Sequence, residues 1–269
     1  MKNNSEEIIK LFIWNNQSFG DALTMIPVIE YIKEKYPNVK FKIGCYKKQA
    51  YIYEHLTNDI ETINQNYEFC SYRKYFWSHI REKCPDDYIP IHPWLGNYNF
   101  TVHSLENQIK SFNYQFEEKK VPLKIDFNIP PYINLPFRDI KVRPNAIYIE
   151  NGPTISGHGQ FFHDIEKYAL FFPKLNFYTT YDSKCKLKNV VNCFNCDLID
   201  LQNISNKCKL FIGKGSGPFI TTFTRENESK LKILSDNRPF WDLDKPNTIE
   251  LNDEKLIIEQ IRIINKEIS

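Results

Sequence analysis

An aspartate near the amino end of the chain stands where a predicted loop meets a predicted helix. Asp21 follows Ser18 and Gly20, and the loop begins directly after the apolar run 11–14. Open α/β sheets bind ligands at the carboxyl ends of their strands, which is where this loop starts. A carboxylate there is able to act as a general base toward an acceptor hydroxyl. Asp is equally suited to be a helix N-cap, so the residue type leaves both roles open.

A second loop, GKGSGP, occupies positions 213–218 and follows the apolar segment 209–212. Three glycines in five positions allow a tight turn and bring backbone N–H groups close to an anion. The spacing is not that of a P-loop, and an ordinary strand-to-helix turn is the alternative interpretation. We predict phosphate or diphosphate binding. The residues of this loop that we expect to contact the ligand are Gly213, Lys214, Gly215, Ser216, Gly217 and Pro218.

A third loop, NGPTISGHGQ, covers positions 151–160 after the apolar run 146–149, and it holds three more of the nine glycines in the chain. Its hydroxyl, amide and imidazole groups are suited to hydrogen bonding with a phosphate or sugar, although a surface loop has the same composition. Lys214 and His158 are the expected charge partners of a diphosphate. The residues of this loop with a predicted donor-binding role are Gly152, Thr154, Ser156, Gly157, His158 and Gln160.

Cys193 and Cys196 form a CxxC pair after a predicted strand at 190–191. No second pair and no HxxxH or HxH spacing completes a set of four metal ligands, so we interpret these cysteines as structural and predict no metal site. Trp241 follows the predicted strand 231–234, where its ring is able to stack on a sugar.

The elements that position these residues form a repeating β/α pattern. Apolar residues recur at helical spacing across 21–37, and segment 39–43 alternates like a strand, so the first 45 residues predict one β-α-β unit with parallel strands. The fold class is therefore α/β. Further helices are expected at 49–56, 71–83, 163–172, 201–208 and 253–266. Further strands are expected at 60–63, 88–91, 146–149, 176–180, 190–191, 209–212 and 231–234.

The segment 127–144 contains four prolines and little helical periodicity, which is typical of a linker. We place a domain boundary there, with domains at 1–135 and 136–269. Both domains begin with a strand, a glycine-containing loop and a helix. Two Rossmann-like domains are the simplest interpretation.

Composition excludes several classes of function. The 269 residues include 35 Lys plus Arg and 33 Asp plus Glu, so a net charge of +2 provides no broad attraction to nucleic acid or to an acidic membrane. No apolar run approaches the roughly 18 residues of a membrane span, and the amino end lacks a signal-peptide core. Seven scattered cysteines fit reduced thiols. We expect a cytoplasmic protein whose contact with membranes is at most peripheral.

Two segments together resemble a known family. FGDALTMIPVIEYIKEKYPNVKFKI is similar to the N-terminal signature of the heptosyltransferase-like glycosyltransferases of family 9, which have the GT-B fold; Gly20, Asp21, Pro27 and Pro37 match it. LFIGKGSGPFITTF resembles the segment of that family in which a Ser/Thr-Gly pair follows a strand and binds the diphosphate of the donor, and positions 216–218 match.

The resemblance implies a GT-B glycosyltransferase of hexosyl or heptosyl type, with two Rossmann-like domains facing a central cleft. The N-terminal domain would hold a glycan, lipid-linked or protein acceptor, and the C-terminal domain a nucleotide-diphosphate sugar as co-substrate. It further implies an inverting transfer without metal or other cofactor, in which Asp21 is the base. We place Ser18, Gly20 and Trp241 on the acceptor side.

The chain departs from the family at three places. Gly215 stands where members carry Asp, Phe219 stands where they carry His, and His158 is the nearest counterpart of a Lys in the first loop of the second domain. The donor is therefore open between ADP-heptose and another nucleotide sugar. Two alternatives share the fold: a nucleotide-sugar epimerase or hydrolase, and a non-catalytic glycan-binding or assembly protein.

Overall fold

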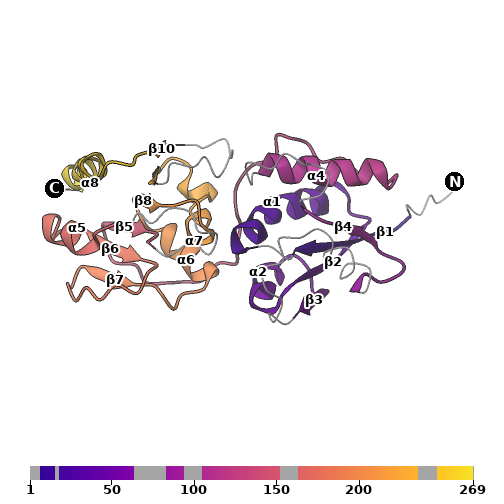
Figure 1. The fold of residues 1–269 in the computed structure, drawn as a ribbon, viewed down its shortest axis with the longest axis horizontal. Coiled ribbons are helices and arrows are strands. Elements are labelled where there is room, and N and C mark those ends of the chain that lie inside the picture. The colour runs from indigo at the N-terminus through magenta and orange to yellow at the C-terminus, as the bar shows by residue number, and fades with distance from the viewer. Residues whose placement is uncertain are drawn as a thin grey trace. The chain divides into compact units, whose positions relative to one another are not determined.

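The computed structural model describes residues 7–15, 18–63, 83–93, 105–151, 163–235 and 247–268. The chain divides into two compact units, Met1–Pro131 and Tyr132–Ser269. Each unit contains one sheet with helices packed against it (Figure 1). Every strand pairing among the described residues is parallel, which confirms the α/β class and the β-α-β opening of the chain.

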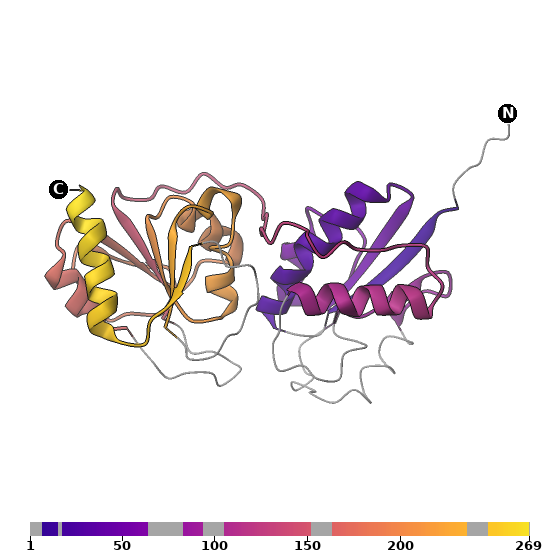
Figure 2. The ribbon, with the colours of Figure 1, turned by 90° about the horizontal axis from the view of Figure 1, so that it is seen from above.

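The sheet of the first unit has the strand order β3-β2-β1-β4. Helices α1 and α4 lie side by side in this unit (Figures 1 and 2). The described elements are β1 (Ile9–Asn15), α1 (Phe19–Lys35), β2 (Val39–Tyr46), the 3₁₀ turn η1 (Lys47–Gln49), α2 (Ala50–Tyr53), β3 (Ile60–Ile63), β4 (Ile89–Ile91) and α4 (Leu105–Glu118).

The first β-α-β unit ends its helix where the sequence predicts. Helix α1 stops at Lys35 because Tyr36 precedes a proline, which disfavours the helical conformation, and Tyr36 has φ −128° and ψ 79°. The next strand, β2, then pairs with β1 so that Ile9 lies opposite Val39. The whole of β1 from Leu11 onward is buried, so its carboxyl end delivers the following loop at a fixed position.

One glycine in β2 is required by packing. The indole of Trp14 lies over Gly44, where a Cβ would approach Trp14 Cε3 to 2.0 Å and Phe12 Cζ to 3.0 Å. The rings of Phe12 and Trp14 also pack against each other, with centroids 5.6 Å apart. Glycine therefore allows two large side chains to cover one face of the sheet.

The sheet of the second unit has the order β10-β9-β8-β5-β6-β7. Chain order and spatial order differ because β8 returns to pair with β5 on the side away from β6. The described elements are β5 (Ala146–Ile149), α5 (Ile165–Phe171), β6 (Asn176–Thr179), β7 (Val190–Asn192), α6 (Leu198–Ser205), β8 (Leu210–Gly213), α7 (Gly217–Ile220), η2 (Arg225–Asn227), β9 (Leu231–Leu234), β10 (Thr248–Glu250) and α8 (Glu254–Ile268).

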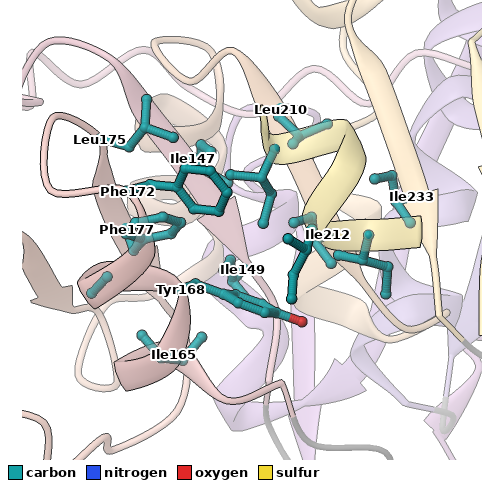
Figure 3. Close-up of a cluster of buried hydrophobic side chains, with 14 residues drawn as sticks. Ile147, Ile149, Ile165, Tyr168, Phe172, Leu175, Phe177, Leu210, Ile212 and Ile233 are labelled. Carbon is teal, nitrogen blue, oxygen red and sulfur yellow. The ribbon is translucent and has the colours of Figure 1, made fainter. Parts of the chain in front are cut away.

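Helices cover both faces of this sheet (Figures 1 and 2). One face carries α5 and α8, and their apolar side chains meet those of the strands in one buried cluster (Figure 3). Ile147, Ile212 and Ile233 come from three neighbouring strands of that cluster, and each is fully buried. The opposite face carries α6 and α7. This two-sided cover explains why the strands are continuous apolar runs rather than alternating ones.

The structure differs from the sequence-based prediction in three elements. Helix α4 and strand β10 were not predicted, and α6 begins three residues before the expected start at 201. The buried face of α4 includes Gln108, Ser111 and Gln115 beside its apolar residues, which interrupts the hydrophobic periodicity. Most of the helix expected at 71–83 lies outside the described residues. In the part of the chain that the structure describes, no helix has the length and apolarity needed to cross a membrane.

Candidate functional site

Asp21 lies in the first turn of α1 and is 5% exposed. It is not the N-cap, because that position belongs to Ser18. The Asp21 carboxylate instead accepts two hydrogen bonds at Oδ2, from Ser18 N–H at 3.0 Å and from Ser18 Oγ–H at 2.7 Å. The two residues thus form a capping box that closes the helix start. Ser18 is half-buried and Gly20 is buried.

Neighbouring elements hold this turn in place. Gln108 of α4 donates from Nε2 to Thr24 Oγ1 at 2.7 Å, and Thr24 Oγ1 donates to the Asp21 carbonyl at 3.1 Å. Tyr53 of α2 donates its hydroxyl to the Ala22 carbonyl at 3.3 Å. These buried polar contacts fix the backbone on both sides of the carboxylate.

The carboxyl edge of the first sheet carries two polar residues that the sequence did not single out. Asn15 ends β1 and donates from Nδ2 to the Tyr53 hydroxyl at 3.0 Å. His92 follows β4, which pairs with β1, and burial holds the pKa of its imidazole well below the usual range. Its carbonyl accepts from Ser111 Oγ at 3.0 Å and Gln115 Nε2 at 2.6 Å. His92 is therefore a neutral imidazole on a well-anchored backbone, at the same edge as Asn15.

The glycine-rich turn of the second unit begins at the carboxyl end of β8. Glu150, directly after β5, accepts from Lys214 N–H at Oε2 over 3.2 Å. Glu150 is 1% exposed and the Lys214 side chain is fully buried. The missing side chain of Gly213 makes room for this contact, since a Cβ there would lie 2.6 Å from Glu150 Cβ.

The turn then enters the short helix α7. Ser216 is its N-cap, and Ser216 Oγ is buried without a hydrogen-bond partner among the described residues. The Pro218 carbonyl accepts from the Tyr148 hydroxyl at 2.9 Å, which ties the start of α7 to the sheet. Gly215 and Gly217 are half-buried. The turn is therefore anchored at its two ends, and it presents a hydroxyl that the described part of the protein does not satisfy.

A buried network next to this turn links three further segments. Asn151 and His163 exchange two hydrogen bonds, at 2.9 Å and 2.8 Å, across the loop between β5 and α5. His163 Nε2 lies 2.9 Å from Ser235 Oγ, and Ser235 Oγ donates to the Gly213 carbonyl at 3.0 Å. Sequence reasoning missed Glu150, Asn151 and Ser235, which follow strands, and His163, which precedes α5, because no local spacing links them.

The network assigns the protonation state of His163. Because Ser235 Oγ–H donates to a carbonyl, its oxygen accepts from His163 Nε2–H, and His163 Nδ1 accepts from the Tyr168 hydroxyl at 3.3 Å. This is the pattern of a neutral imidazole. Burial, and secondly the charge of Lys214, lower the pKa of His163 to about 4.

We expect His163 to make the protein sensitive to acid. Its pKa falls from 6.5 to about 4 on folding, so between these values the unfolded chain binds the extra proton and unfolding becomes easier as pH falls. The slope is about 1.4 kcal/mol per pH unit, with a total of roughly 3 kcal/mol between pH 6.5 and 4. Urea unfolding measured at steps across this window should show a flatter pH dependence for His163→Gln than for the wild type. Equal slopes would show that His163 does not carry the effect.

The remaining predicted site residues lie outside the described residues. These are Gly152, Thr154, Ser156, Gly157, His158, Gln160 and Trp241. Their donor-side and acceptor-side roles stay predictions. Within the described ranges, no group of three or more His, Cys, Asp or Glu side chains is placed to hold a metal ion.

Comparison with known proteins identifies the fold. No family model and no curated protein matches the sequence. Among solved structures, the chain is similar to the E. coli ADP-heptose LPS heptosyltransferase II, with a TM-score of 0.61, 10% identity, and coverage of 96% of this chain and 99% of that one. A family 9 glycosyl transferase from Veillonella parvula gives a TM-score of 0.58 at 11% identity, covering 95% and 90% of the two chains.

The E. coli heptosyltransferase WaaC, solved with ADP-2-deoxy-2-fluoro heptose, gives a TM-score of 0.57 at 12% identity and covers 97% of this chain and 100% of that one. The chain therefore has the GT-B fold of two Rossmann-like domains, and the resemblance to family 9 is confirmed at the level of the fold.

Proposed function

We propose that the protein is a glycosyltransferase that moves a sugar from a nucleotide-diphosphate donor to an acceptor hydroxyl. The observation that carries this proposal is the likeness to glycosyltransferases over almost the whole chain, together with the place of the two predicted loops. Both loops follow a strand at the carboxyl edge of a parallel sheet, where α/β proteins bind ligands.

The donor diphosphate binds at the glycine-rich turn 213–218 in this proposal. Ser216 Oγ supports it, because a buried hydroxyl without a partner normally finds one in a ligand or water. Lys214 brings positive charge to the same turn, and this charge is the second cause of the lowered pKa of His163. Neutralisation of the leaving diphosphate by backbone N–H groups and this charge needs no metal ion.

The acceptor binds at the first unit, where Asp21 takes the proton of the attacking hydroxyl. Attack on the anomeric carbon from the side opposite the diphosphate inverts its configuration. Asn15, Tyr53 and the capping box hold the surrounding backbone, so the carboxylate is positioned before the acceptor arrives.

We expect nucleotide-diphosphate sugars to raise the melting temperature and Ser216→Ala to weaken that effect. A ligand at a hundred times its Kd stabilises the folded state by about 2.7 kcal/mol. UDP-, GDP- and ADP-linked sugars should be compared with a CMP-linked sugar, which lacks the second phosphate. Ser216→Ala removes a hydroxyl that has no described protein partner, so the ligand-free melting temperature should not fall. The affinity of Ser216→Ala for the nucleotide sugar that binds the wild type should drop by about tenfold. This is the loss expected for one hydrogen bond to a charged group.

Thr222→Ala is the matched control, because Thr222 Oγ1 already donates to the Phe219 carbonyl at 2.7 Å and is not available to a ligand. It should lower stability without changing donor affinity. Equal donor affinity in Ser216→Ala and the wild type would remove the turn from the donor site. Failure of every nucleotide diphosphate to bind would favour the non-catalytic alternative.

The protein should be incubated with the nucleotide sugar that binds it, with and without an acceptor, and the products analysed. This experiment separates sugar transfer from hydrolysis and epimerisation. Transfer releases nucleoside diphosphate only when an acceptor is added, whereas a hydrolase releases it without one. An epimerase changes the sugar and leaves the diphosphate bond intact. Release of nucleoside diphosphate at the same rate with and without an acceptor would overturn the proposal.

A further inference from the structure

The CxxC pair follows a strand, as the sequence predicts, and it also leads directly into a helix. Cys193 follows β7 directly, and α6 begins at Leu198 with Asp197 as its N-cap. The pair therefore joins a strand to the start of a helix, which the sequence-based prediction did not foresee because it placed the helix at 201–208. This junction lies apart in sequence from the glycine-rich turn and from His163.

Hydrogen bonds fix the backbone on both sides of the pair. Cys193 N–H donates to the Thr179 carbonyl at 2.8 Å, which extends the β6–β7 pairing, and Cys196 N–H donates to the Cys193 carbonyl at 3.0 Å. Asn192 Oδ1 accepts from Phe194 N–H at 2.9 Å. On the helix side, Asp197 Oδ1 accepts from Asp200 N–H at 2.8 Å.

An arginine adds a third restraint. Arg138 Nη1 contacts Asp197 Oδ2 at 2.8 Å and Asp200 Oδ1 at 2.7 Å, so one guanidinium holds both acidic residues of the first helical turn. The four residues of the CxxC turn are thus held at both ends. The bond from Cys196 N–H to the Cys193 carbonyl closes this turn and places the two cysteines at its two ends.

The two thiols differ in access. Cys193 Sγ donates to the Val191 carbonyl over 3.9 Å. Each thiol acts on the pKa of the other, because Cys196 raises the pKa of Cys193 and the side-chain interaction with Cys193 lowers that of Cys196. Cys193 is 3% exposed, Cys196 is half-buried, and the ring of Phe194 between them is 58% exposed. Such a pair has one thiol that an external reagent reaches and a second thiol in position to resolve the adduct.

We propose that Cys193 and Cys196 form a dithiol site that exchanges with low-molecular-weight disulfides and closes a reversible disulfide between β7 and α6. The Cys196 thiolate, its proton given to water, attacks one sulfur of the small disulfide; the new mixed disulfide forms as one small thiolate leaves. The Cys193 thiolate then attacks the Cys196 sulfur and expels the adduct as a second small thiolate. The two protein thiols are oxidised, the small disulfide is reduced to two thiols, and the two protons end on those products.

The charges around the pair set the rate of this exchange. Burial raises the pKa of Cys193 to about 12 and also raises that of Cys196, and Asp200 raises both further. Asp197 acts on Cys196 in the same direction, while Arg138 is engaged with the two aspartates. Because the thiolate is the nucleophile, exchange is slow at pH 7 and accelerates by up to about tenfold per pH unit above it.

The test exposes the full-length native protein to glutathione disulfide at pH 7, 8 and 9, followed by alkylation and peptide mass spectrometry. We expect the peptide that contains both cysteines to lose two hydrogens, to regain them with dithiothreitol, and to carry no lasting glutathione. Cys193→Ser should leave Cys196 trapped as the mixed disulfide, because the resolving thiol is gone. Cys196→Ser should leave the buried Cys193 unmodified.

Cys185, also half-buried, is the internal control, since it lies outside the turn and should carry only a mixed disulfide. A wild-type protein that accumulates glutathione on Cys196 without closing the disulfide would overturn the proposal. Equal modification of Cys193 in the presence and absence of Cys196 would also overturn it. The backbone hydrogen bonds that shape the turn do not involve the thiols, so both variants should keep the turn folded.

Discussion

Replacing Asp21 with Asn should lower the rate of sugar transfer by a factor of about 10²–10⁴, the usual contribution of a general base. The amide oxygen of Asn is able to accept the same two hydrogen bonds from Ser18, so the capping box and the fold should persist. The amide cannot take the acceptor proton. The loss should therefore appear in kcat at saturating donor and acceptor, with the donor affinity of the second unit unchanged.

Asp126→Asn is the matched control for this substitution. Asp126 is an exposed carboxylate of the same unit, where it accepts from Lys35 Nζ at 2.9 Å. An exposed ion pair contributes little to stability, so this variant should keep both its melting temperature and its rate. If Asp21→Asn transferred sugar as fast as Asp126→Asn, the carboxylate at position 21 would be a capping group without a catalytic role.

The order of elements was predictable from the sequence because it depends on local patterns. Apolar runs, helical spacing and the proline at position 37 predicted β1, α1 and β2 and their parallel pairing, and the structure confirms them. The role of Ser18 was also readable, since Ser three residues before an acidic residue is the pattern of a capping box. It was missed because Asp21 was considered alone as a cap or a base.

The network of the second unit was not predictable, because its partners are far apart in the chain. Glu150 and Lys214 are separated by 64 positions, and His163 and Ser235 by 72. No local periodicity links such residues. Glu150, Lys214 and Ser235 meet because they follow β5, β8 and β9, which are neighbours in the sheet, and Asn151 holds His163 beside them.

The chain has only nine glycines in 269 residues. Some of them mark constrained positions, although not always for the expected reason. Gly213 was expected to approach a ligand, and the structure shows a packing requirement there. Gly44, which no motif marked, is equally constrained by Trp14. A glycine in a strand marks a close approach to the backbone, and the sequence does not say whether a ligand or the protein's own side chain makes that approach.

Gly213→Ala should destabilise the second unit by about 1–3 kcal/mol, the usual cost of overpacking a core. The new Cβ would lie 2.6 Å from Glu150 Cβ and 2.7 Å from Phe219 Cδ2. Glu150 Cβ is attached to the backbone at the end of β5, so the end of β8 or the start of α7 has to move. Either movement lengthens the bond from Lys214 N–H to Glu150 Oε2 and disturbs the turn that we propose to hold the diphosphate.

The expected result is therefore a loss of stability together with a loss of nucleotide-diphosphate affinity of at least about tenfold, the size of one charged hydrogen bond. Urea unfolding measures the loss of stability. Titration with the nucleotide diphosphate that binds the wild type measures the loss of affinity. The double variant Gly213→Ala with Phe219→Leu tests the cause, because the smaller side chain removes one of the two close contacts. Its destabilisation should be smaller than the sum of the single effects, as residues in contact are coupled. Strict additivity would contradict this packing explanation, and unchanged nucleotide affinity in a destabilised Gly213→Ala would separate the turn from donor binding.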